Sequence, residues 1–184
     1  MEIILVRHGQ PVASENTKVT ASGFGRWVQN YDKSLVAKHS LPNKQELMDL
    51  DQYFVVSSAL KRAVHSAQLL TNESPQQQLS LLNEMEIPRY KLPFTLKAWT
   101  WLYLCRLLWM FGKKGKFESF KKAKQRARLA TNKLISLADE QQKVLVFGHG
   151  VMNLYVRKNL VKQGWKVVEK NNKYWGVTRL VYCV

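Results

Sequence analysis

The sequence predicts an α/β fold: a three-layer α/β/α sandwich with a mostly parallel central sheet and a helical insertion. Three short apolar runs without polar alternation, at 3–6, 53–56 and 144–147, are typical of strands covered on both faces. Helical patterns lie between and after these runs, and alternating strands and helices are typical of a parallel sheet. A chain of 184 residues is long enough to bury one core, so we predict a single domain over 1–184.

Three helices are predicted from periodicity, over 60–70, 119–138 and 151–161. The first follows the pair Ser57-Ser58, whose hydroxyl groups can cap a helix amino terminus. The second places small and apolar residues near one face, as expected of a helix that packs on a sheet.

Two shorter segments complete the predicted architecture. Weak alternation over 178–184 predicts a closing strand, and the polar stretch 76–78 after Pro75 predicts a loop.

A hydrophobic content of 46% excludes a disordered polycation. Two cysteines favour a reducing compartment, and the first residues lack the features of a signal peptide. We therefore expect a cytoplasmic protein.

The formal net charge of +16 is unevenly distributed. Residues 89–128 hold twelve basic side chains and one acidic side chain, a net +11, whereas the rest of the chain carries only +5. The sequence therefore predicts a mildly basic α/β body with a basic, Trp-rich insertion at about 89–128. Such charge indicates either nucleic-acid or membrane binding, or an anionic substrate.

The insertion is too often interrupted to cross a membrane. Lys97 and Arg106 break the apolar stretch 92–111, and a membrane span needs about 20 apolar residues. One interpretation is a helical flap packed over the sheet, with lysines that face solvent or the pocket and would attract anionic substrates. Weak peripheral membrane contact through 89–128 stays open, because basic Trp-rich helices bind anionic lipid surfaces.

Basic and imidazole side chains follow the three predicted strands. Arg7 and His8 come directly after the first strand, Arg62 shortly after the second, and His149 after the third. Because the carboxyl ends of parallel strands meet at one edge, we expect these side chains to lie together. Arginine matches phosphate oxygens, and histidine supplies a nucleophile or a proton donor near neutral pH. The arrangement predicts a site that binds a dianion and attacks it.

In these motifs the sequence resembles the histidine phosphatase (phosphoglycerate mutase-like) superfamily, in its small phosphatase branch. The motifs occur in the family's order and comprise Leu5-Val6-Arg7-His8-Gly9, Ser57-Ser58-Ala59-Leu60-Lys61-Arg62-Ala63, Leu82-Asn83-Glu84 and Val146-Phe147-Gly148-His149-Gly150. The resemblance implies that His8 is the nucleophile and forms a phosphohistidine. It also implies that Arg7, Arg62 and His149 bind the phosphoryl group and stabilise its transition state, without a metal or another cofactor.

The resemblance further implies that Glu84 protonates the leaving group and then activates water. Glu86 lies two residues further on and is the alternative proton donor. Gln10 and Pro11 follow Gly9 where better-known members carry Thr or Ser and then Asn, which favours a phosphatase over a mutase.

The expected function is metal-independent hydrolysis of a phosphomonoester, on a small molecule or a phosphoprotein, with no obligatory nucleic-acid partner. A mutase that moves a phosphoryl group within one sugar-acid phosphate is the first alternative. A non-catalytic binder of anionic surfaces is the second.

Two further side chains have open roles: His65 lies either at the pocket edge or on a helix surface, and Asn153 is either a phosphate contact or an ordinary first-turn residue.

Overall fold

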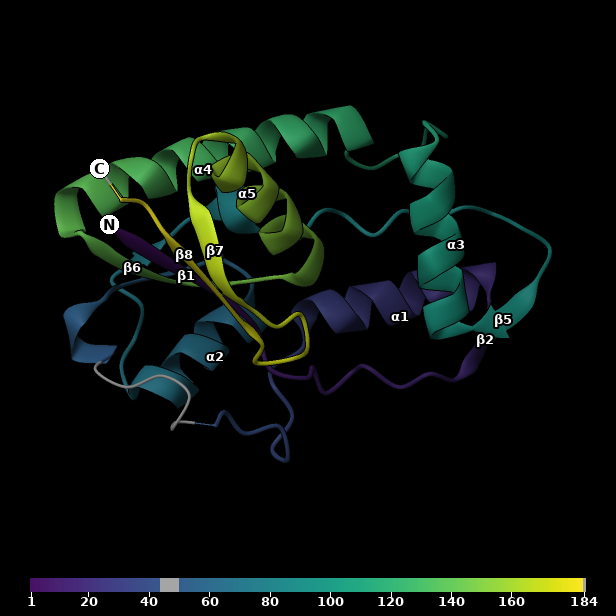
Figure 1. The fold of residues 1–184 in the computed structure, drawn as a ribbon. Coiled ribbons are helices and arrows are strands. Elements are labelled where there is room, and N and C mark those ends of the chain that lie inside the picture. Colours follow the sequence, from purple (N-terminus) through teal and green to yellow (C-terminus); the bar gives the residue numbers. More distant parts are fainter. Residues whose placement is uncertain (44–49, 184) are drawn as a thin grey trace.

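The computed structural model describes residues 1–43 and 50–183 and has three layers around one six-stranded sheet (Figure 1). The strand order is β4-β3-β6-β1-β8-β7. The bounds are β1 Glu2–Arg7, β3 Phe54–Ser57, β4 Gln77–Gln78, β6 Lys143–Gly148, β7 Lys166–Lys170 and β8 Val177–Val181. Strands β4, β3, β6 and β1 are parallel, and β8 and β7 add antiparallel pairs. The predicted fold class, with its mostly parallel sheet, is confirmed.

The three predicted apolar runs form the centre of the sheet, as β3, β6 and β1. Their register aligns the carboxyl ends: Arg7 is level with Gly148, and Ser57 is level with Phe147. The residues that follow these three strands therefore emerge at one edge of the sheet.

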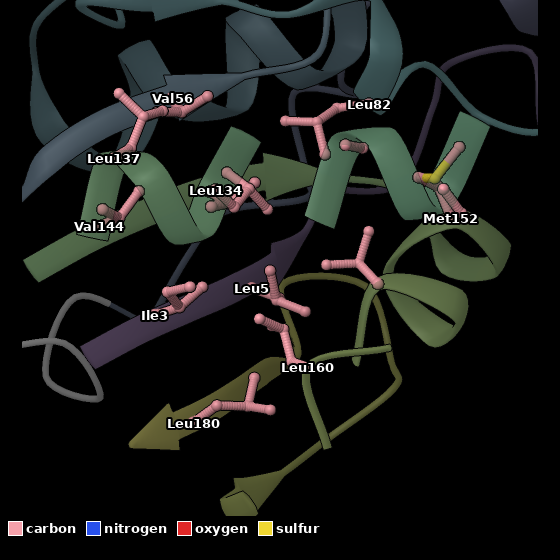
Figure 2. Close-up of a cluster of buried hydrophobic side chains, with 14 of the residues drawn as sticks. Ile3, Leu5, Val56, Leu82, Leu134, Leu137, Val144, Met152, Leu160 and Leu180 are labelled. Carbon is pink, nitrogen blue, oxygen red and sulfur yellow. The ribbon is translucent and has the colours of Figure 1, made fainter. Parts of the chain in front are cut away.

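Helices cover both faces of the sheet, with α2 (Lys61–Thr71) on one face and α4 (Phe120–Gln141) and α5 (Gly150–Lys162) on the other (Figure 1). These are the three helices predicted from periodicity. Figure 2 shows the core beneath α4 and α5, where side chains of β1, β3 and β6 face leucines of both helices. The labelled core residues include Ile3, Leu5, Val56, Val144, Leu134, Leu137 and Leu160.

A second group of elements lies at one side of the sheet. It comprises α1 (Ala21–Lys33), α3 (Ala98–Met110) and a two-stranded sheet of β2 (Lys18–Thr20) and β5 (Thr95–Lys97). The two helices share a core that includes Phe24, Trp101 and Cys105. The basic segment 89–128 thus contains β5, α3 and the start of α4, with α3 standing to the right in Figure 1.

Two local predictions are wrong. The Ser57-Ser58 pair does not cap α2, because the capping residue is Leu60 and it makes no side-chain capping bond. Residues 77–78 form strand β4 rather than a loop, pairing with β3 at Val56 and Ser57. Backbone pairing at a sheet edge tolerates glutamine side chains, so their polarity did not reveal this strand.

The remaining elements are two short 3₁₀ helices, η2 (Leu50–Gln52) and η3 (Ser80–Leu82). The predicted closing strand is β8, and the end of that prediction, Val184, lies outside the described residues. Within residues 1–43 and 50–183, no helix combines the length and apolar character that crossing a bilayer requires.

Candidate active site

The structure brings His8, Arg62 and His149 together at the carboxyl edge of the sheet. His8 follows β1, Arg62 lies in the first turn of α2, and His149 is the residue just before α5. The Arg62 Nε atom lies 3.3 Å from the His8 Nε2 atom, and the two imidazole ring centres are 5.0 Å apart. All three side chains are buried.

The hydrogen bonds of His8 define which of its ring nitrogens is free to react. Its Nδ1 atom lies 2.7 Å from the Gly9 carbonyl oxygen, which can only accept a hydrogen bond. Nδ1 therefore carries the proton, and Nε2 keeps its lone pair, consistent with the bond donated by Arg62. Burial, and then the charges of Arg62 and Arg7, hold the pKa of His8 well below the ordinary value of 6.5. The imidazole is neutral at neutral pH, as a nucleophile must be.

Arg62 is held by the carboxyl end of α1. Its Nη1 atom donates to the carbonyl oxygens of Tyr31 and Asp32, at 3.2 and 3.3 Å, and lies 3.6 Å from the Asp32 carboxylate. The guanidinium group also stacks on the Tyr31 ring, 4.9 Å from its centre. These contacts fix the orientation of the guanidinium and favour its positive charge, because helix carboxyl ends attract cations.

His149 is oriented by the hydroxyl group of Ser58, which lies 2.6 Å from its Nε2 atom. The same hydroxyl oxygen accepts a hydrogen bond from the Leu60 N–H group, which leaves its own proton free to donate to His149. Nδ1 would then carry the proton of the neutral ring. Burial is the main cause that holds the pKa of His149 well below 6.5, followed by the charges of Arg62 and neighbouring groups.

Arg7 is held by the loop between β7 and β8. Its Nη1 atom donates to the Asn172 carbonyl oxygen at 3.0 Å, and its guanidinium stacks 4.3 Å above the Tyr174 ring. The same loop approaches Gly9 closely: a Cβ atom at Gly9 would lie 2.6 Å from the Trp175 ring. Glycine is therefore required after His8 for steric reasons.

Each of three site residues retains an unsatisfied buried nitrogen. Arg7 Nε, Arg62 Nη2 and His149 Nδ1 have no hydrogen-bond partner among residues 1–43 and 50–183. Buried donors are normally paired, and an anion with several acceptor oxygens is the kind of ligand that would pair such nitrogens. A phosphoryl group has that chemistry.

Glu84 follows η3 and reaches the amino end of α5. Its carboxylate accepts hydrogen bonds from the backbone N–H groups of Val151 at 3.2 Å, Met152 at 3.0 Å and Met85 at 2.9 Å. Positive potential at the helix amino end favours an anionic group there. Glu86 points elsewhere: it is exposed and accepts a hydrogen bond from the Glu118 N–H group at 2.6 Å.

A cleft of about 310 Å³ is lined by Arg7 and Glu84, but not by His8, Arg62, His149 or Glu86. Both Glu84 and Glu86 line a second cavity, of about 460 Å³. Helix α3 contributes four side chains to the first cleft, at positions spaced as one helix face: Trp99, Leu102, Tyr103 and Arg106. The remaining lining residues are Tyr31, Ile87, Gly150, Val151, Leu154 and Asn172. The cleft is therefore largely apolar, with a guanidinium group contributed by α3.

Arg106 is a candidate binding residue that the sequence analysis counted only as a charge. It is nine-tenths buried, and its Nη2 atom donates to the Met85 carbonyl oxygen at 2.6 Å. Its Nε and Nη1 atoms have no hydrogen-bond partner within the described part of the chain. The spacing of Arg106 from Trp99 along one helix face is a signal that could have placed it beside the cleft.

Arg126, on α4, holds the segment that carries Glu84. Its guanidinium donates to the carbonyl oxygens of Leu81 and Asn83 at 2.9 and 2.6 Å, and forms a two-bond ion pair with Glu118 at 2.9 and 2.8 Å. Arg126 was also counted only as part of the basic insertion. The carbonyl oxygens that it binds lie more than forty residues away in sequence, and no local motif indicates them.

The two side chains with open roles lie outside the cleft lining. His65 accepts a hydrogen bond from the Val36 N–H group at 3.2 Å, and Asn153 donates to the Val6 carbonyl oxygen at 3.2 Å. A larger cavity of about 600 Å³, formed by residues 20–22 and 89–95, contains none of the predicted site residues. In the part of the chain that the structure describes, no group of three or more His, Cys, Asp or Glu side chains is placed to bind a metal.

Fold and site together define a class: an α/β fold with two histidines and two arginines at the carboxyl edge of its sheet. The chain belongs to the histidine phosphatase superfamily, branch 1, whose family model matches residues 3–182. The resemblance noted in the sequence is thereby confirmed. No curated protein matches the sequence closely enough to narrow the assignment.

Several solved structures share the fold. An Entamoeba histolytica phosphoserine phosphatase variant in complex with phosphoserine is 14% identical, with a TM-score of 0.61 over 99% of this chain and 91% of that one. An alpha-ribazole phosphatase from Shigella flexneri is 21% identical, with a TM-score of 0.58 over 97% and 89%. A mycobacterial glucosyl-3-phosphoglycerate phosphatase is 17% identical, with a TM-score of 0.56 over 88% and 82%. At these identities the likeness concerns the fold alone.

Proposed function

We propose that the protein is a metal-independent phosphomonoesterase that acts through a phosphohistidine on His8. The observation that carries the proposal is a neutral, buried His8 whose Nε2 atom accepts from Arg62, in a site where Arg7, Arg62 and His149 each keep an unpaired buried nitrogen. Such donors stabilise the negative charge on the transferring phosphoryl group, and the transfer depends mainly on positioning and charge.

The reaction would proceed in two displacements. In the first, His8 Nε2 forms a bond to phosphorus while the bond to the leaving oxygen breaks, and Glu84 gives that oxygen its proton. The negative charge of a phosphoryl group bound beside Glu84 opposes the effect of the helix end and favours the protonated form. In the second, the Glu84 carboxylate takes a proton from water, whose oxygen attacks phosphorus and releases His8. We assign the proton donor role to Glu84 because its carboxylate reaches the amino end of α5, beside His149, whereas Glu86 is exposed and contacts the Glu118 N–H group.

Substrate entry requires a local rearrangement. His8 is only 2% exposed, and the rings of Tyr31 and Tyr174 pack against the two arginines that surround it. A bound phosphoryl group would take the place of the Arg62–His8 contact and of part of the space beside these rings. We therefore expect the rings to shift when substrate binds.

The cleft supports a small phosphate ester as substrate rather than a phosphoprotein. Its volume of about 310 Å³ lies in the range of small-molecule sites, and its apolar lining suits an organic leaving group. Arg106 would bind an acidic or polar part of that group through its unpaired N–H donors. The fold relatives named as phosphoserine and alpha-ribazole phosphatases are consistent with a small substrate.

The test is hydrolysis of p-nitrophenyl phosphate with and without EDTA, by the wild type and by His8→Ala. We expect EDTA to leave the rate unchanged and the substitution to lower kcat by roughly a thousandfold or more, since the nucleophile is removed. The matched control is His39→Ala, which changes an exposed histidine and should retain activity. Equal rates for His8→Ala and the wild type would refute the proposal. Rapid interconversion of 3- and 2-phosphoglycerate would support the mutase hypothesis instead.

A further inference from the structure

Helix α3 exposes an apolar face on the side away from its buried residues. We define the outer face of α3 as Tyr103, Leu107, Met110 and the following residue, Phe111. All four are exposed, and Phe111 is 83% exposed. Their spacing of three or four residues places them along one side of the helix.

Apart from Arg106 and the exposed Thr100 in its first turn, the rest of α3 is apolar as well. Trp101, Cys105 and Trp109 are buried in the protein, and the one charged residue of the helix, Arg106, is buried and lines the cleft. A helix that is apolar all round is normally enclosed by protein or by lipid. In α3 only the inner side is enclosed, so the outer face lacks an apolar partner within the described residues.

Positive charge flanks the outer face at both ends. Lys97 precedes α3, and Lys113, Lys114 and Lys116 follow Phe111; all four lysines are exposed. No acidic residue occurs between positions 87 and 117. Of the two carboxylates that border this range, Glu118 is paired with Arg126, and Glu86 accepts a backbone hydrogen bond.

We propose that the outer face of α3 docks on an anionic lipid bilayer, with its apolar side chains in the interface and the flanking lysines at the headgroups. Apolar residues flanked by lysines, without acidic residues, are typical of helices that lie in the plane of a membrane surface. At 13 residues α3 would lie along the surface rather than cross it.

Charge favours lipid over the other occupants of such a face. A second copy of this chain would bring two molecules of net charge +16 together, with their lysine clusters close to one another. A nucleic acid would use the lysines, and a single strand could stack bases on Tyr103 and Phe111, but Leu107 and Met110 would stay in water. An anionic bilayer contacts both parts of the surface: its acyl region contacts the apolar side chains, and its headgroups bind the flanking lysines.

Docking in this way would place the active-site cleft beside the bilayer. Tyr103 belongs to the outer face and also lines the cleft, so the two surfaces share an edge. The proposal does not depend on catalysis, since vesicle binding and phosphatase activity are measured separately.

The experiment is co-sedimentation of the full-length protein with phosphatidylcholine vesicles that contain, or lack, phosphatidylglycerol. We expect binding only to the anionic vesicles, and weaker binding at high salt. The charge-neutral double variant Leu107→Ser/Phe111→Ser should lower vesicle affinity by at least about tenfold, because the apolar contact is lost. Replacing Lys113, Lys114 and Lys116 by glutamine should lower it similarly.

The matched control is Leu129→Ser, which changes an exposed leucine on α4 and should bind as the wild type does. Circular dichroism and thermal unfolding check that each variant is folded, independently of catalytic activity. Equal vesicle binding by Leu107→Ser/Phe111→Ser and the wild type would overturn the proposal, as would a failure of the wild type to bind anionic vesicles. A dimer in sedimentation that the same double variant dissociates would assign the face to a second copy and also overturn it.

Discussion

His8, Arg62 and His149 could be placed together from sequence because each follows a strand of one parallel sheet. The carboxyl ends of such strands meet at one edge, so chain position alone predicts proximity. The same rule places Ser58, which directly follows β3, beside His149. Arg106 and Arg126 could not be assigned in this way, because they lie on helices and their contacts depend on how those helices pack rather than on strand ends.

Ser58 should orient His149, and Ser58→Ala tests this role. Removing the hydroxyl leaves the buried Nε2 atom of His149 unpaired, which should lower the free energy of unfolding by about 1–3 kcal/mol. It should also lower kcat, since the ring is no longer held with Nδ1 toward the phosphoryl group. Urea unfolding and p-nitrophenyl phosphate kinetics measure the two effects. Ser57→Ala is the control, since Ser57 donates only to the Ser58 carbonyl oxygen, and equal kcat values for the two variants would contradict this role.

Arg106 should bind the leaving group of the substrate. We expect Arg106→Leu to raise KM for acidic phosphate esters such as phosphoserine by about tenfold, because a buried guanidinium contact contributes roughly 1.5 kcal/mol or more. The KM for a phosphate ester with an uncharged leaving group should change less. Arg128→Leu removes the same charge from an exposed position on α4. If both variants raise KM equally, Arg106 acts only through the overall electrostatic potential of the protein and not through a direct contact with the leaving group.

At the scale of the elements, the three central strands and the three helices that cover them were predictable. Helix α1 was not predicted, although Phe24, Trp27, Val28 and Tyr31 follow a helical period and are buried. Gly23 and Gly25 lower the helix propensity of this segment and weaken the pattern.

Strand β7 was not predicted either, for a different reason. All five of its residues are exposed, so it has neither the apolar run of a buried strand nor a buried alternating face. It pairs only with β8, at the edge of the sheet, and its backbone bonds carry no side-chain signature. The partner strand β8 is mostly buried and could be predicted.

Arg126 connects α4 to the segment that carries Glu84, so Arg126→Leu should affect both stability and activity. The carbonyl oxygens of Leu81 and Asn83 lose their donor, and Glu118 loses its ion-pair partner. We expect a loss of about 1.5–3 kcal/mol in the free energy of unfolding and a lower kcat, because Glu84 is less well positioned.

The control for this prediction is Arg128→Leu, an exposed arginine on the same helix whose replacement should change stability by less than about 0.5 kcal/mol. Thermal or urea unfolding and steady-state kinetics give both readouts. A variant at Arg126 that keeps wild-type kcat would show that Glu84 is positioned without it.

For the whole molecule, the net charge of +16 separates into different roles. Arg106 lines the cleft, Arg126 forms internal contacts, and Lys113, Lys114 and Lys116 lie on the surface beside the outer face of α3. The sequence predicted where the charge is concentrated. It could not predict this division, since adjacent turns of the same helices direct charged side chains both inward and outward.

The buried histidines should make the folded protein sensitive to acid. The pKa values of His8 and His149 are well below 6.5 in the folded protein, so below that pH the unfolded chain binds more protons. This contribution to stability is fully present above about pH 6.5 and decreases as the pH falls toward the folded-state pKa values. The decrease is up to about 1.4 kcal/mol per pH unit for each histidine.

Urea unfolding of the wild type between about pH 7.5 and 5.5 measures this dependence. His8→Asn should reduce the slope of the free energy of unfolding against pH, because one of the two buried histidines is removed. His39→Asn, at an exposed position, should leave the slope as it is. A slope that is the same in all three proteins would mean that the burial of His8 does not govern its protonation.

The central claim is that His8 carries the phosphoryl group during turnover, and trapping that intermediate tests it most directly. The protein is mixed rapidly with p-nitrophenyl phosphate, quenched in alkali and digested, and the phosphorylated peptide is identified by mass spectrometry. We predict a phosphoryl group on the peptide containing His8, stable in alkali, lost in acid, and formed equally in the presence of EDTA. A phosphoryl group on any other residue, or turnover by His8→Ala at the wild-type rate, would contradict the account.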